Sequence, residues 1–158
     1  MTVGWRMART VSRGLWVLLW ASVVLSGLGL SISGYLVAKR FTGGSLACTR
    51  WAQCDVVNNS VYSQLYGVPV SVIGLAGYLL LLMLAVAALW TEGRTQRRTL
   101  LLSFVLALGG VGFSIYLTYL EIYVIEALCA WCVASAIVIA LLAIVTAVAS
   151  RLTTPKGA

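Results

Sequence analysis

The chain has 158 residues, of which 61% are hydrophobic and 9% are charged, and its formal net charge is +7. Soluble domains are roughly half apolar and about one quarter charged, so this composition excludes a soluble enzyme, a nucleic-acid-binding domain and a disordered protein. The length fits one domain.

The chain begins with a basic segment, residues 1–14, which is followed by 25 uncharged residues between Arg13 and Lys39. Because a helix of about 20 apolar residues can cross a bilayer, this run predicts a first membrane helix over residues 15–38. The run is far longer than the ~7–15-residue core of a secretory signal. We therefore expect this helix to stay in the membrane.

A long connection, residues 39–68, follows the first helix. A loop of this length without a fold of its own is usually functional. Its last part, residues 58–67, predicts a short half-helix that has Asn59 or Ser60 as its N-cap and ends at Gly67.

Three further uncharged runs predict the remaining membrane helices, over residues 69–90, 99–120 and 128–150. Short connections, residues 91–98 and 121–127, join them, and residues 151–158 form a tail. The sequence therefore predicts an all-α fold: an integral membrane four-helix bundle over residues 15–150, with a long loop and a half-helix between its first two helices.

The basic residues are concentrated at one end of the predicted helices. Cytoplasmic ends of membrane helices collect Lys and Arg. The protein is therefore predicted to lie in the cell membrane with both of its termini on the cytoplasmic side. This orientation places eight of the eleven basic residues on the cytoplasmic face: Arg6, Arg9, Arg13, Arg94, Arg97, Arg98, Arg151 and Lys156. Lys39 and Arg40 are expected at lipid headgroups on the outer side, where the 39–68 loop also lies.

The same orientation places all four cysteines on the outer side, which is oxidising in bacteria and in the secretory pathway. Cys48 and Cys54 lie in the long loop, and Cys129 and Cys132 form a C-x-x-C at the start of the fourth helix. The two cysteines of a C-x-x-C share one face of a helix, and the helix N-terminus favours a thiolate there. Arg50 favours a thiolate in the loop pair in the same way. Four cysteines allow three pairings.

The residues by themselves leave several functions open. A redox relay is favoured, because a C-x-x-C that begins a membrane helix is poorly suited to holding loops together. A membrane scaffold with structural loop disulfides is the first alternative. A zinc site is disfavoured, because the five residues between Cys48 and Cys54 exceed the usual spacing. A small multidrug transporter needs a membrane-embedded acid, whereas Glu121 and the other three acids are predicted in loops or at helix edges.

The cysteine pairs occur in a wider pattern that resembles a known family. The pattern consists of Cys48 and Cys54, a serine six residues after the second of them (Ser60), the segment Gly67-Val68-Pro69 before the second helix, and the C-x-x-C at Cys129. Together these features resemble the vitamin K epoxide reductase family in its prokaryotic form, over essentially the whole chain.

The resemblance implies a bundle of four helices around a membrane quinone. It implies that Cys132 faces the quinone and that its partner Cys129 exchanges with Cys54. Cys48 and Cys54 would take electrons from the dithiol of a thioredoxin-like protein, and Ser60 would cover the pocket and contact a quinone oxygen. The implied activity is quinone-dependent thiol oxidation in support of disulfide bond formation, and the structure is expected to contain a Cys48–Cys54 or a Cys54–Cys129 disulfide.

Two positions depart from the animal members of the family, which have an asparagine at the position of Val70 and a tyrosine at that of Ala136. Vitamin K quinone or epoxide reduction is therefore the alternative activity. A DsbB-like oxidase ranks lower, because its C-x-x-C lies in the first outer loop. Since the chain carries no thioredoxin-like domain, we expect a separate DsbA-type partner on the outer side, no nucleic acid, and a monomer.

Overall fold

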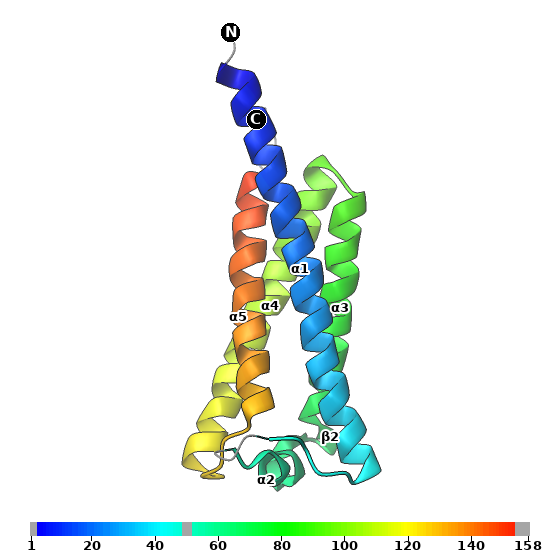
Figure 1. Cartoon of the computed structure of the whole chain (residues 1–158), viewed down its shortest axis with the longest axis vertical. Helices are drawn as coiled ribbons and strands as arrows, with labels where there is room; N and C mark the ends of the chain where they lie inside the picture. The colour runs from blue at the N-terminus through cyan, green and yellow to red at the C-terminus, as the bar shows by residue number, and fades with distance from the viewer. Residues whose placement is uncertain (1–2, 49–51, 154–158) are drawn as a thin grey trace.

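The computed structural model describes residues 3–48 and 52–153, with side chains from residue 13 onward. Across these residues, four helices are long and apolar enough to cross a membrane. They are α1 (Val3–Thr42), α3 (Val70–Trp90), α4 (Gly93–Tyr123) and α5 (Ala130–Leu152). The predicted all-α bundle of four helices is therefore confirmed (Figure 1).

The helices extend beyond the predicted apolar runs at several ends. α4 begins six residues before its predicted start, so that it includes Arg94, Arg97 and Arg98, and it ends three residues later than predicted. Arginine forms helices well, so helical hydrogen bonding continues past the apolar run. Many large apolar side chains face outward, as expected where lipid replaces water around the helices.

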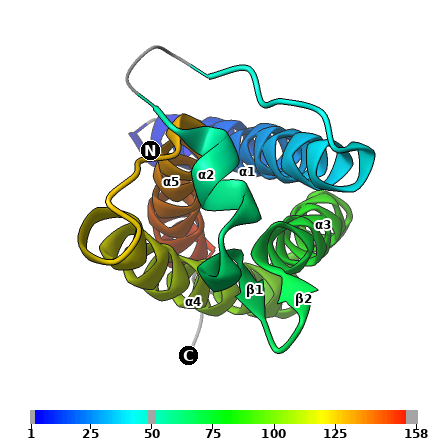
Figure 2. The ribbon, with the colours of Figure 1, turned by 90° about the horizontal axis from the view of Figure 1, so that it is seen from below.

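The four long helices form a ring in the order α1, α3, α4, α5 when the bundle is seen end-on (Figure 2). Small buried residues lie where the helices approach one another: Ser22, Ser26, Ala88, Ala107 and Ala149. Such residues let helix backbones come close together, which strengthens packing in a membrane.

The connection between α1 and α3 lies across one end of the bundle, which we call the loop end (Figures 1 and 2). It contains the short helix α2 (Cys54–Asn59), one turn of 3-10 helix, η1 (Val61–Ser63), and a hairpin of two short strands, β1 (Gln64–Leu65) and β2 (Val68–Pro69). Gln64 pairs with Pro69, and Leu65 with Val68. α1 begins and α5 ends at the opposite end of the bundle.

The predicted short half-helix between the first two membrane helices is confirmed, but its predicted position, residues 58–67, is wrong. The short helix ends where that half-helix was predicted to begin, and Ser60 is the residue that follows it rather than the one that starts it. Both the backbone N–H and the Oγ of Ser60 donate to the Val57 carbonyl. The cause lies further along the chain: Tyr66 and Gly67 both have positive φ and form a tight two-residue hairpin turn, which excludes helix there.

Arg40 holds this connection against the end of α1. Its Nη1 donates to the backbone carbonyl of Asn58 and to Ser63 Oγ, the latter at 2.8 Å. Arg40 therefore has a structural role in the loop, in addition to the headgroup position that the sequence predicts. Arg50, predicted to favour a thiolate, lies outside the described residues, as do the first two and the last five residues of the chain.

Candidate functional site

The loop cysteines and the C-x-x-C are in different oxidation states. Cys48 and Cys54 form a disulfide with a Cα–Cα distance of 6.3 Å, which is one of the two pairings expected. Cys129 and Cys132 are free thiols. The structure thus holds one oxidised and one reduced pair.

Two hydrogen bonds dock the loop pair onto the start of α5. The Gln53 N–H donates to the Leu128 carbonyl at 3.0 Å, so that the residues preceding Cys54 and Cys129 are joined directly. The Trp131 indole N–H donates to the Ala47 carbonyl at 2.9 Å, next to Cys48. Both loop cysteines are therefore held beside the C-x-x-C.

The segment before Cys48 is fixed by further contacts. The Leu46 N–H donates to Asp55 Oδ1 at 2.8 Å, and the Ala47 N–H donates to the Tyr35 hydroxyl at 3.1 Å. The rings of Tyr35 and Trp131 lie 5.0 Å apart. These contacts connect α1, the loop and α5 around the disulfide.

Burial separates the two cysteines of the loop disulfide. Cys54 is 1% exposed and lies with the fully buried Cys129 in one apolar cluster, against which Cys132 packs. Cys48 is only half-buried. An incoming thiolate therefore meets Cys48 more readily than Cys54, while Cys54 is the one enclosed beside the C-x-x-C.

Cys129 is the N-cap of α5, where its Sγ accepts the Cys132 backbone N–H at 3.4 Å. The Cys132 thiol also donates to it, and these hydrogen bonds hold the pKa of the Cys129 thiol below its usual value in spite of burial. The thiolate character expected from a helix N-terminus therefore belongs to Cys129.

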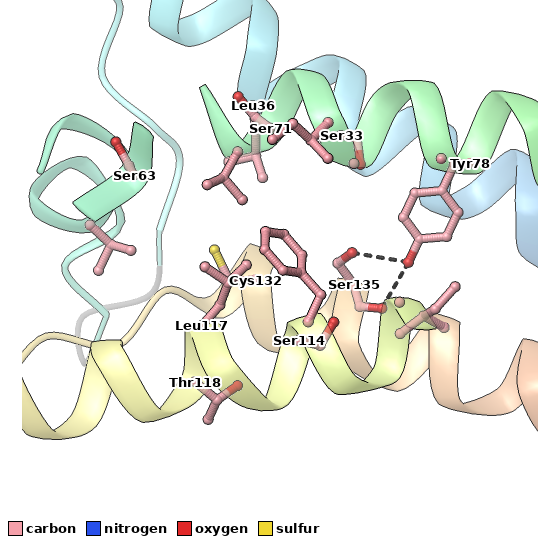
Figure 3. A pocket seen from close by; sticks show the side chains of 18 of the residues that line it. Ser33, Leu36, Ser63, Ser71, Tyr78, Ser114, Leu117, Thr118, Cys132 and Ser135 are labelled. Atoms are coloured by element: carbon pink, nitrogen blue, oxygen red, sulfur yellow. Dashed lines mark hydrogen bonds between the residues drawn. The ribbon is translucent and has the colours of Figure 1, made fainter. Parts of the chain in front are cut away.

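A cavity of about 350 Å³ opens among the four long helices beneath α2 and η1. Its walls are largely apolar, and both Cys132 and Ser60 line it. Figure 3 shows Cys132 on the side of the cavity nearer the loop and Tyr78 farther along it. An apolar cavity with a few polar groups suits a flat, lipid-soluble ring such as the quinone that the resemblance implies.

The polar groups of the cavity differ in their hydrogen bonding. The Tyr78 hydroxyl donates to the Ser135 carbonyl at 2.9 Å and lies 3.0 Å from Ser135 Oγ (Figure 3). Ser60 Oγ donates to Val57. Ser71 Oγ, in contrast, is buried without a hydrogen-bond partner among the described residues. A hydroxyl of this kind has a proton free for a ligand oxygen.

Glu121 is a candidate site residue that is absent from those predicted from the sequence, which places it in an outer loop. The structure places it within α4, only 3% exposed, at the wall of the same cavity. Its Oε2 accepts the Cys129 N–H at 3.0 Å. The sequence does contain an indication of this role, because Glu121 lies at the edge of an apolar run and close to the C-x-x-C. Ionisable residues inside membrane proteins are usually functional.

Comparison with known protein families gives a match over most of the chain. A sequence model of the vitamin K epoxide reductase family matches residues 20–147, most of the chain. The matched range contains all four cysteines, Ser60, Glu121 and the residues that line the cavity.

Proposed function

The chain belongs to the vitamin K epoxide reductase family, and on that premise we propose that it is a quinone-dependent thiol oxidoreductase. It oxidises the dithiol of a thioredoxin-like partner and passes the electrons to a membrane quinone, which supports disulfide bond formation. The observation that carries the proposal is the arrangement at the loop end: a disulfide, a free C-x-x-C and an apolar cavity lie side by side.

The loop disulfide receives the electrons first. A thiolate of the partner attacks Cys48, the more exposed sulfur, and forms a mixed disulfide while Cys54 leaves as a thiolate. The second thiol of the partner then attacks the mixed disulfide. The partner departs with a disulfide, and Cys48 and Cys54 remain as a dithiol.

Cys54 passes the electrons on to the C-x-x-C. When Cys129 and Cys132 are joined, the Cys54 thiolate attacks Cys129 Sγ, and Cys132 leaves with the electron pair. Cys48 then attacks Cys54, which restores the loop disulfide and frees Cys129. The Gln53–Leu128 hydrogen bond supports this exchange because it holds the two reacting cysteines next to each other. The product has the oxidation states that the structure displays.

The C-x-x-C must then be oxidised again. A bound quinone supplies that oxidation, because it takes up two electrons and two protons to become a quinol. Cys132 presents its sulfur at the cavity wall, and Cys129, with its lowered pKa, is placed to close the disulfide with it.

Two serines are proposed to hold quinone oxygens. Ser60 lines the cavity, as the resemblance implies, but its proton is committed to the Val57 carbonyl. Ser71 has a free hydroxyl proton and is therefore the stronger candidate donor. Val70, at the position where animal members have an asparagine, lines the cavity with an apolar side chain, which favours thiol oxidation over epoxide reduction.

The proposal is tested with purified protein in lipid nanodiscs, a reduced thioredoxin-like protein and a quinone, with quinol formation as the measurement. Cys129→Ala and Cys132→Ala are expected to abolish turnover. Cys48→Ala is expected to lose turnover with the protein partner and to retain it with dithiothreitol, a small dithiol that can reduce Cys129–Cys132 directly. Quinol formation by Cys132→Ala at the unmodified rate would contradict the proposal and favour the scaffold.

A further inference from the structure

Glu121 is a buried carboxylate that contacts the backbone of Cys129 and the thiol of Cys132. Its Oε2 accepts the Cys129 backbone N–H at 3.0 Å, and the same carboxylate is a second acceptor for the Cys132 thiol proton, which it shares with Cys129 Sγ. The Cys129 N–H therefore fixes the orientation of the carboxylate toward the cysteine that lines the cavity.

No positive charge lines the cavity beside Glu121 in the part of the chain that the structure describes. Among the described residues that line the cavity, none is Lys or Arg, and the titratable groups there besides Glu121 are Cys132, Tyr62 and Tyr78. A buried carboxylate without a cation is costly, and a purely structural acceptor for one N–H need not carry a charge. The arrangement is suited to a group that gains and loses a proton.

We propose that Glu121 is a catalytic residue that accepts the proton of the Cys132 thiol and delivers it to the quinone oxygen. This inference rests on the proposed function and adds the proton path to it. The carboxylate touches the reacting sulfur and borders the cavity, so that one side chain can reach both ends of the transfer.

The transfer balances with the electron flow. Oxidation of the two thiols forms the Cys129–Cys132 bond and releases two electrons and two protons, which convert quinone to quinol. Glu121 takes one proton from Cys132 Sγ and gives it up again, so the carboxylate is unchanged after each turnover. The second proton comes from water, which has taken up the proton of Cys129.

The first test needs no quinone. In reduced Cys129→Ser protein, the rate of Cys132 alkylation by iodoacetamide is measured against pH by peptide mass spectrometry. A proton shared between Cys132 and Glu121 gives two steps with a plateau between them, because the two groups titrate as a pair. Glu121→Gln keeps the size of the side chain and an oxygen acceptor, and its alkylation rate should rise with pH in one step. Glu121→Asp should restore the two-step pH dependence. A one-step pH dependence of Cys132 alkylation in the protein that retains Glu121 would overturn the proposal.

The second test measures quinol formation in a single turnover of the reduced protein. Loss of a general acid–base group costs typically 10²–10⁴-fold, so Glu121→Gln should be slowed about 100-fold. The matched control is Glu126→Gln, because Glu126 is the next acid along the chain and is exposed; it should remain within twofold. Equal rates for Glu121→Gln and the unsubstituted protein would overturn the assignment of Glu121 alone, whereas an unsubstituted protein that forms no quinol would overturn the proposed function.

Discussion

Only two residues separate Cys129 from Cys132 on the chain, but the two cysteines lie in different surroundings. Cys129 is fully buried at the N-cap of α5 and accepts hydrogen bonds, whereas Cys132 donates to it and borders the cavity. The difference follows from helix geometry, because the free N–H groups of a helix point back at its N-cap residue. One cysteine is thereby prepared as a nucleophile and the other as the sulfur that meets the cavity.

We expect Cys129 to be a thiolate at a lower pH than an ordinary thiol. The thiolate is present above its lowered pKa and is lost as the pH falls through that value. Cys132→Ala removes the thiol donor and should move the first ionisation step to higher pH, as followed by the ultraviolet absorbance of the thiolate. Val133→Ala, an exposed neighbour on α5, serves as control. If the first thiol ionisation occurs at the same pH in Cys132→Ala as in the unsubstituted protein, this explanation is contradicted.

Helix packing shapes the cavity from the side opposite the cysteines. Gly29 of α1 lies against the ring of Tyr78 of α3, so closely that a Cβ on Gly29 would overlap it. Tyr78 in turn donates across the bundle to Ser135 of α5. One glycine therefore permits a contact that connects three helices.

Gly29→Ala should displace Tyr78 and lower the free energy of unfolding by about 1–3 kcal/mol, as overpacking does. Thermal unfolding in detergent measures this change. Gly27→Ala is the matched control, because a Cβ there meets nothing within 4 Å; it should be neutral or slightly stabilising. Equal unfolding temperatures for the two variants would show that the Gly29–Tyr78 contact does not limit the packing.

The loop elements depend on a side chain from α1. Because Arg40 donates to Asn58 and Ser63, it ties α2 and η1 together above the cavity. Arg40→Gln should raise the hydrogen-exchange rate of residues 54–63 about tenfold, since a hydrogen bond from a charged group contributes roughly 1.5–3 kcal/mol. Arg94→Gln, at the start of α4, should leave that rate unchanged. Exchange in residues 54–63 that is insensitive to Arg40 would indicate that other contacts hold the loop.

At the scale of the whole molecule, the two ends of the bundle have different chemistry. The loop end carries the disulfide and the C-x-x-C, while the first turns of α4 at the opposite end carry Arg94, Arg97 and Arg98. Since Lys and Arg collect on the cytoplasmic side, we propose that the loop end faces outward and that both termini are cytoplasmic.

Labelling tests this orientation. In a variant without the native cysteines, Ser45→Cys at the loop end should react with a membrane-impermeant thiol reagent in intact cells. Thr95→Cys, near the start of α4, should react only after lysis. Both positions are exposed in the bundle, so that burial does not bias the comparison. Reaction of Thr95→Cys alone in intact cells would reverse the topology.

The sequence by itself determined the fold class and the four sulfur atoms of the site. Uncharged runs long enough to cross a bilayer specify helices irrespective of their neighbours, because lipid offers backbone groups no other hydrogen-bond partners. The two cysteine pairs were recognisable from their spacing, and the Cys48–Cys54 disulfide was among the expected pairings.

Only the tertiary structure decided where the polar residues of the site lie. The short helix was placed too late in the chain, because the Tyr66–Gly67 turn and Arg40 fix that segment through contacts that local propensity does not contain. Glu121 was assigned to a loop, because charge alone suggests exposure. The buried carboxylate of Glu121 accepts a hydrogen bond from the backbone N–H of Cys129, eight residues away. The turn between α4 and α5 brings the two groups together.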